Sequence, residues 1–254
     1  MITIKDLSFR YDRTNHDVLN NLNFEIFPGT VNVLLGLNGC GKTTLIKLLA
    51  GLLDNNRGDI QYDSRSIREL PIKERSKVFA YVAQIRSGND EFLVKDYLAY
   101  GFVNTLKFYE SPKKEQLEQV DAIAKRFNIE HLLGKELGQL SGGEKQIVTI
   151  ASAIIQNTPI VILDEPTSAL DLKNQNLVLS ILKDIAKEGK TIIMSSHNPN
   201  HALFLNANVL LMNDGEIKKI GNAKEIIKVN ILKEVYGDAI CLSKDLSYEE
   251  ISFN

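Results

Sequence analysis

Cysteine is scarce in this sequence of 254 residues, which contains only Cys40 and Cys241. The two stand far apart and form no CxxC pair, so the spacing suggests neither a disulfide framework nor a zinc site. A reducing compartment is therefore the expected setting.

Long apolar runs are missing as well. Runs such as residues 160–163 and 209–212 are far shorter than the roughly 18 residues of a membrane-spanning helix. The first residues also lack the continuous apolar stretch of a secretory signal. If the protein works at a membrane, we expect it to dock there through a partner.

An excess of charge of one sign is the third absence. The 30 Lys and Arg residues nearly balance the 32 Asp and Glu residues, and the basic side chains are scattered along the chain. Nucleic-acid-binding domains usually show a basic footprint, so no nucleic-acid partner is expected. The hydrophobic fraction of 44% is ordinary for a globular protein and argues against disorder.

The apolar pattern predicts an α/β fold. The first 30 residues alternate apolar and polar positions, which indicates an antiparallel β section. Residues 31–35 form a continuous apolar run, typical of a strand buried on both faces, and a helix is expected over about 42–50.

A mainly helical insertion is expected between residues 84 and 157, where the period changes to about 3.6. Buried strands then return, joined by an amphipathic helix, and a hairpin forms around Asn213-Asp214-Gly215. The predicted helices of the insertion cover 94–102, 113–127 and 144–156; the later segments are strands 160–163 and 191–194, helix 174–186 and hairpin strands 209–212 and 216–220.

Residues 36–44, GLNGCGKTT, match the GxxxxGK(S/T) phosphate-binding pattern between a predicted strand and a predicted helix. Glycines let successive N–H groups surround an anion at a helix N-terminus. Lys42 would reach the β- and γ-phosphates, Thr43 would bind Mg²⁺ and Thr44 the α-phosphate. The candidate ATP-binding residues of this loop are Gly36, Asn38, Gly39, Cys40, Gly41, Lys42, Thr43 and Thr44.

Cys40 has two interpretations. A thiol at a helix N-terminus is reactive when its pKa is lowered. The alternative, which we favour, is a small side chain that fills a tight loop.

A second glycine turn decides between P-loop families. Residues 140–144, LSGGE, resemble the signature motif of ATP-binding-cassette (ABC) proteins, and they place Ser141, Gly142 and Gly143 at a helix start. The resemblance implies that this turn contacts the γ-phosphate held by a second copy, so a head-to-tail homodimer is expected. A mere helix cap is the alternative interpretation.

Residues 160–165, IVILDE, resemble the Walker B strand of that family. Four apolar residues bury the strand, and two carboxylates follow at its end. The resemblance implies that Asp164 holds Mg²⁺ through water and that Glu165 is the general base. Ordinary acids at a strand end are the alternative.

Four further positions match the ABC pattern. The resemblance implies that Gln84 senses Mg²⁺ and the attacking water and that Asp171 crosses the dimer interface. It also implies that His197 contacts the γ-phosphate and orients Glu165. Tyr11 is the expected platform for adenine, since stacking of a base on an aromatic ring contributes about 1–3 kcal/mol; Phe9 is the alternative, although its alternation suits a core position.

The resemblance covers about residues 1–221. It implies an ABC ATPase domain over 1–225 with a helical subdomain at about 85–157, followed by a short C-terminal extension over 226–254. The fold expected is a P-loop NTPase core with a mixed sheet and an N-terminal antiparallel β section.

The overall length, the short insertion over 88–101 and the segment 229–237 resemble those of bacterial importer subunits for iron-siderophore, haem and cobalamin uptake. These act at the cytoplasmic face of the membrane with integral permease subunits and, indirectly, an external substrate-binding protein. Import of another substrate such as molybdate, a soluble ABC ATPase, and a P-loop kinase or GTPase are the alternatives; no NKxD sequence supports a GTPase.

Overall fold

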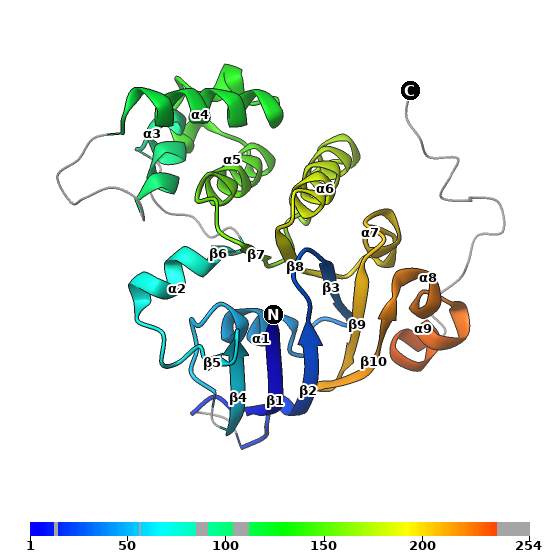
Figure 1. Ribbon diagram of the computed structural model, residues 1–254. Coiled ribbons are helices and arrows are strands. Elements are labelled where there is room, and N and C mark those ends of the chain that lie inside the picture. Colours follow the sequence, from blue (N-terminus) through cyan, green and yellow to red (C-terminus); the bar gives the residue numbers. More distant parts are fainter. Residues whose placement is uncertain (13–14, 56, 85–90, 104–111, 238–254) are drawn as a thin grey trace.

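The computed structural model of this chain contains two β-sheets, with helices between and above them (Figure 1). The structure describes residues 1–12, 15–55, 57–84, 91–103 and 112–237. Within these ranges no helix combines the length and the apolar character that a bilayer crossing requires.

The smaller sheet is antiparallel and has the strand order β2-β1-β4-β5. Alternate residues of its strands point into the core, as Ile2 and Ile4 do in β1, and an irregularity in the register between Ile4 and Leu7 keeps Leu7 buried as well. This sheet includes the antiparallel section predicted for the first 30 residues. Its strands are β1 (Ile2–Phe9), β2 (Leu19–Ile26), β4 (Arg57–Tyr62) and β5 (Arg65–Ser66).

The larger sheet is mixed, as predicted, with the order β10-β9-β3-β8-β7-β6. The pairs from β9 to β6 are parallel, and β10 pairs antiparallel with β9 at one edge. Its strands are β3 (Val31–Gly36), β6 (Phe79–Val82), β7 (Ile160–Leu163), β8 (Thr191–Ser196), β9 (Asn208–Asn213) and β10 (Glu216–Asn222).

Both faces of the larger sheet are buried. In β3, Val33 and Leu35 belong to one hydrophobic cluster and Leu34 to the other. The cluster with Leu34 also holds the apolar residues of α1 (Lys42–Leu49) and of the smaller sheet, so α1 lies between the two sheets. Strands covered on both faces have continuous apolar sequences, which is why they could be predicted.

The described part of the helical region expected at 85–157 lies to one side of the sheets (Figure 1). It contains α3 (Val94–Ala99), α4 (Lys114–Arg126) and α5 (Gly142–Ile155), with short 3₁₀ turns at Tyr100–Phe102, Glu130–Leu132 and Leu137–Gln139. The amphipathic helix expected at 174–186 is α6 (Leu172–Lys187).

The sequence patterns missed the segment between 57 and 82 and one later helix. Besides β4, β5 and β6, this segment contains α2 (Ile72–Val78), which has no buried residue and therefore no apolar stripe to detect. The helix that was missed is α7 (Pro199–Phe204), which is too short for its periodicity to be recognised.

The end of the described chain packs on the main core. Leu232 and Val235 of α9 (Val229–Tyr236) belong to the same hydrophobic cluster as β3 and β9. The boundary expected between 225 and 226 lies inside α8 (Ala223–Ile226), so residues up to 237 are continuous with the core.

The predicted hairpin turn between β9 and β10 also supports the phosphate-binding loop. Asp214 and Gly215 have φ of 48° and 75°, as a two-residue type I′ turn requires. The Gly215 N–H donates to the Cys40 carbonyl at 3.2 Å, and the Gly215 carbonyl accepts from Asn20 at 2.9 Å. The turn therefore holds the phosphate-binding loop through the hydrogen bond to Cys40.

Replacement of Gly215 by Ala tests this contact between the turn and the phosphate-binding loop. An added Cβ would stand 2.5 Å from the Val18 carbonyl oxygen, so we expect a loss of about 2–4 kcal/mol in urea unfolding. Gly189→Ala is the control, because Gly189 has φ of 96° but no atom within 4 Å of the new Cβ. That variant should lose only about 1–2 kcal/mol. Equal losses of stability in the two variants would show that the positive φ, and not the contact with Val18, sets the cost of the added Cβ.

Candidate functional site

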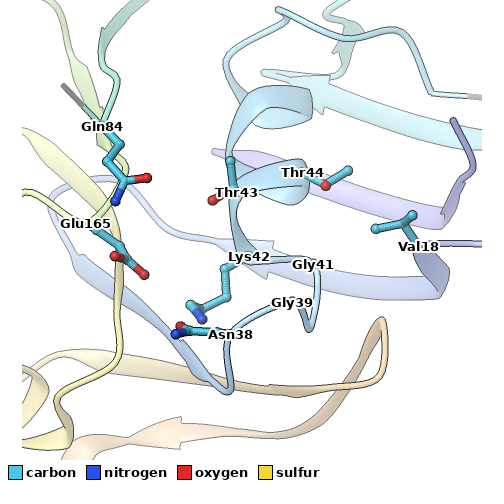
Figure 2. Close-up of a pocket in the computed structure, with 9 residues that line it drawn as sticks. All are labelled: Val18, Asn38, Gly39, Gly41, Lys42, Thr43, Thr44, Gln84 and Glu165. Carbon is cyan, nitrogen blue, oxygen red and sulfur yellow. The ribbon is translucent and has the colours of Figure 1, made fainter. Parts of the chain in front are cut away.

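The glycine-rich loop joins the end of β3 to the start of α1 (Figure 2). Gly39 and Gly41 have φ of 84° and 105°, which other residues rarely adopt. The Lys42 ammonium donates to the carbonyls of Gly36 and Leu37, each at 2.9 Å. The lysine therefore lies across its own loop, with its charge directed at the space that the loop surrounds.

A cavity of about 310 Å³ opens beside this loop. It brings together eight residues predicted to bind or hydrolyse ATP, and Figure 2 shows them with Val18. The lining residues are Val18, Asn38, Gly39, Gly41, Lys42, Thr43, Thr44, Gln84 and Glu165.

Val18 is the lining residue that the sequence patterns missed. It precedes β2, and its carbonyl lies 3.1 Å from the position of a Cβ on Gly41. No local pattern links it to the loop, because the contact depends on how the smaller sheet folds over α1.

Asp164 and Thr43 meet beside the cavity. The Thr43 hydroxyl donates to Asp164 Oδ1 at 3.2 Å, and the carboxylate is buried. One carboxylate and one hydroxyl are the type of donor set that Mg²⁺ uses together with substrate phosphates. Among the described residues no cluster of three or more His, Cys, Asp or Glu side chains could hold a metal alone. These donors thus fit a Mg²⁺ ion that arrives with a nucleotide.

Glu165 and Gln84 lie across the cavity from the P-loop. Figure 2 shows the Glu165 carboxylate directed toward Lys42 and the Gln84 amide next to it. Glu165 adopts a left-handed backbone with φ of 47°, which is rare for a residue with a side chain. This conformation turns its side chain out of the strand direction and toward the cavity.

Nine predicted residues do not line this cavity: Tyr11, Gly36, Cys40, Ser141, Gly142, Gly143, Asp164, Asp171 and His197. Ser141, Gly142 and Asp171 are exposed, as is His197, while Gly143 is half-buried. A single copy therefore does not bring the signature turn onto its own P-loop.

The signature turn is a well-formed helix start. Ser141 Oγ accepts the Glu144 N–H at 3.3 Å, and Glu144 accepts the Ser141 N–H at 2.8 Å. Hydrogen bonds from the Ser141 backbone and side chain lower the pKa of the Glu144 carboxyl. Asp171 similarly caps α6 by accepting the Asn174 N–H at 2.8 Å. Each residue thus has a structural role within its own copy.

The candidate adenine platform is partly exposed. Tyr11 has 37% of its surface exposed, and its hydroxyl lies 3.2 Å from Thr44 Oγ1. Phe9 packs edge-on against it at 4.7 Å and belongs to the hydrophobic core. Of the two aromatic residues, Tyr11 is the one exposed enough for a base to reach, since Phe9 is only 5% exposed.

The Cys40 thiol is buried within the loop. Its sulfur lies 2.7 Å from the position a Cβ on Gly36 would occupy, and burial raises the pKa of the thiol. A raised pKa disfavours the reactive thiolate. The geometry therefore supports the packing interpretation of Cys40.

His201 is a buried polar residue that the sequence patterns missed. Its Nδ1 lies 3.0 Å from Ser196 Oγ and 3.5 Å from Thr167 Oγ1. Burial, with a smaller contribution from His197, lowers the pKa of His201 to about 4. It is therefore neutral at pH 7, and it joins the end of β8 to the segment after β7.

Together the sheet order, the P-loop and the paired carboxylates define a P-loop nucleoside triphosphatase. The family model described as "ABC transporter" matches residues 19–168. This chain therefore belongs to the ABC transporter family, and it is an ATPase subunit of a transporter.

Three comparisons illustrate the relationship. An ABC transporter ATP-binding protein of Haemophilus influenzae is 35% identical, over 93% of this chain and 89% of the relative. A "Probable iron chelatin transport ATP-binding protein" of Helicobacter pylori is 32% identical, over 85% of each chain. An inward-facing ABC transporter described as metal-chelate type matches 92% of this chain and 88% of its own, with a TM-score of 0.78 and 31% identity.

Removal of the buried histidine should change how stability depends on pH. Because the folded pKa of about 4 is below the ordinary 6.5, the unfolded chain binds the proton first as pH falls. The contribution of neutral His201 to the free energy of unfolding is complete above pH 6.5. About 3 kcal/mol of it is lost as the pH falls from 6.5 to about 4.

Unfolding of His201→Gln by urea at pH 7 and at pH 4.5 measures this effect. We expect the variant to lose less stability on acidification than the wild type. His131→Gln, which removes an exposed histidine, should keep the wild-type pH dependence. If the stability of His201→Gln depended on pH as that of the wild type does, the lowered pKa of His201 would be contradicted.

Proposed function

We propose that two copies of this chain close head to tail around ATP and drive import through a partner permease. The observation that carries the proposal is the single cavity that joins Lys42 of the P-loop to Glu165 beyond β7. A cation and a candidate base on opposite sides of one cavity suit hydrolysis of a terminal phosphate.

In this proposal the P-loop binds the phosphates. Gly39, Gly41 and the start of α1 offer N–H groups and a helix dipole, and Lys42 supplies positive charge. Lys42 leaves the Gly36 and Leu37 carbonyls for phosphate oxygens. Thr43 and Asp164 would hold Mg²⁺, which contributes neutralisation of phosphate charge when bound.

Glu165 then activates water. Its carboxylate accepts a proton from a water molecule while the water oxygen forms a bond to the γ-phosphorus. The bond from that phosphorus to the bridging oxygen breaks, and the electron pair stays on ADP. Gln84 and His197 are proposed to orient the water and the carboxylate.

The second copy completes the site with its signature turn. Ser141 Oγ accepts an N–H from Glu144 and the residue is exposed, so its hydroxyl can turn its proton from the Glu144 carboxylate to a phosphate oxygen. Exposed Gly142 and the N-terminus of α5 add further attraction for an anion. Asp171, also exposed, would lie at the contact between the copies.

Replacement of Glu165 by Gln tests the base and the dimer together. The amide keeps the size of the side chain but cannot take the proton, so ATP hydrolysis should fall by about 10²–10⁴-fold. Light scattering with ATP and Mg²⁺ should then show a stable dimer, because closure occurs without turnover.

Lys42→Ala is the control and should neither bind ATP tightly nor dimerise. Full hydrolysis by Glu165→Gln would remove this residue from the role of base. A variant that binds ATP under blocked turnover and remains a monomer would contradict the shared site.

A neighbouring cavity of about 520 Å³ suits the permease contact. Its lining residues are Lys47, Leu52, Leu53, Tyr81, Ala83 and Asp164, with Thr43 and Gln84, which also line the nucleotide cavity. Leu52 is 55% exposed and so offers apolar surface to a partner. We propose that a cytoplasmic helix of the permease rests here, so the chain attaches to the cytoplasmic membrane face and Gln84 connects both cavities.

The proposed cargo is an iron(III)-siderophore, haem or cobalamin, delivered to the permease by an external binding protein. The Helicobacter relative is described by iron chelatin transport and the structural relative by metal chelates, which supports this class.

Uptake assays in a strain that lacks this chain test the cargo. We expect uptake of one of these three compounds to fall, and wild-type protein but not Lys42→Ala to restore it. Normal uptake of all three, with loss of molybdate uptake instead, would contradict the cargo and leave the ATPase unaffected.

A further inference from the structure

Ser195 is a fully buried polar residue at the end of β8, with 0% of its surface exposed. Leu163 lies beside Met194 in the parallel pair β7·β8. The next residues along both strands, Asp164 and Ser195, therefore lie side by side where the strands end.

One hydroxyl contacts both acidic residues of the site. Ser195 Oγ donates to Asp164 Oδ1 at 2.7 Å and accepts the N–H of Glu165 at 2.8 Å. A hydroxyl has one proton and two lone pairs, so both hydrogen bonds form at the same time. The carboxylate acceptor makes the first of them a strong hydrogen bond.

The bond to Asp164 fixes the orientation of its carboxylate. Oδ1 receives the Thr43 hydroxyl at 3.2 Å from α1 and the Ser195 hydroxyl from β8. The carboxylate is thus held between two elements. Without Ser195, only the longer bond would orient it.

The bond to Glu165 supports a strained backbone. A left-handed conformation costs roughly 1–2 kcal/mol for a residue with a Cβ, and Glu165 has φ of 47°. Ser195 binds its N–H, and Ser168 Oγ donates to its carbonyl at 3.0 Å. Both ends of the residue are therefore held in the conformation that directs the side chain to the cavity.

A second buried hydroxyl on the same strand shows what a purely structural role involves. Thr191 Oγ1 accepts the Gly29 N–H at 3.1 Å at the opposite end of β8. It satisfies one backbone group, as Ser195 does, but it lies among loops that are remote from the cavity. Thr191 is therefore a matched comparison for burial and hydrogen bonding.

We propose that Ser195 is a positioning residue for ATP hydrolysis, which sets the Asp164 carboxylate and the backbone of Glu165 through one hydroxyl. The inference rests on the proposed function, because it gives Ser195 the task of orienting those two residues. Ser195 does not face the cavity, so it acts only through its neighbours.

Steady-state hydrolysis by Ser195→Ala tests the inference first. Loss of an orienting contact next to a site typically costs about 10–100-fold, and we expect this loss in kcat with KM changed by less than about threefold. Binding of a fluorescent ATP analogue without Mg²⁺ should match the wild type, while the Mg²⁺ concentration that gives half-maximal binding should rise.

A double-mutant cycle separates positioning from stability. If Ser195 acts through Glu165, Ser195→Ala should reduce the residual rate of Glu165→Gln by less than about threefold. A hydroxyl that only stabilises the fold would instead lower the rate by the same factor in both backgrounds.

Three variants serve as controls. Thr191→Val should keep wild-type kcat, and Ser195→Thr, which retains a hydroxyl, should recover much of the rate. Ser195→Cys keeps the volume but offers only a weak donor, so it should show the same loss of rate as Ser195→Ala. It takes the place of Ser195→Ala in the test if the alanine variant fails to fold.

Wild-type kcat in folded Ser195→Ala, or equal losses in both backgrounds of the cycle together with an unchanged Mg²⁺ requirement, would overturn the inference. Either result, with Glu165→Gln inactive, leaves the proposed function standing. Wild-type hydrolysis by Glu165→Gln is a different failure, since it removes the base itself.

Discussion

The parallel register of β3, β8 and β7 is the constraint on which the site depends. Val33 lies beside Met194, and Met194 beside Leu163, so the three strands end at the same edge of the sheet. The P-loop, Ser195 and the two acidic residues then follow within a few positions. A slip of one residue would reverse the buried faces of a strand and separate these groups.

The residues after the strands have polar partners that the buried sheet alone does not supply. Lys42 binds two carbonyls of its own loop, Thr43 and Ser195 share the Asp164 carboxylate, and His201 joins the end of β8 to the segment after β7. Buried polar groups without such partners would be costly. The same contacts that satisfy them also hold the reacting groups in place, so stability and geometry at this edge have one cause.

The sequence could predict the P-loop and the acidic pair because their information is local. Lys42 and Glu165 each follow a continuous apolar run, and that pattern depends only on burial of both faces. The contributions of Val18 and Ser195 depend on which strands become neighbours. Neither position has a distinctive local pattern that would identify its neighbours.

Within one copy, the segment after Glu165 lies against the signature turn. A Cβ on Gly143, in the signature turn, would lie 3.1 Å from the Ala169 carbonyl, and only a glycine permits this approach without displacement. Ala169 stands four residues after Glu165. In a head-to-tail pair the signature turn would serve one nucleotide and Glu165 the other. The parts of one copy that would serve two different nucleotides are therefore in contact through this segment.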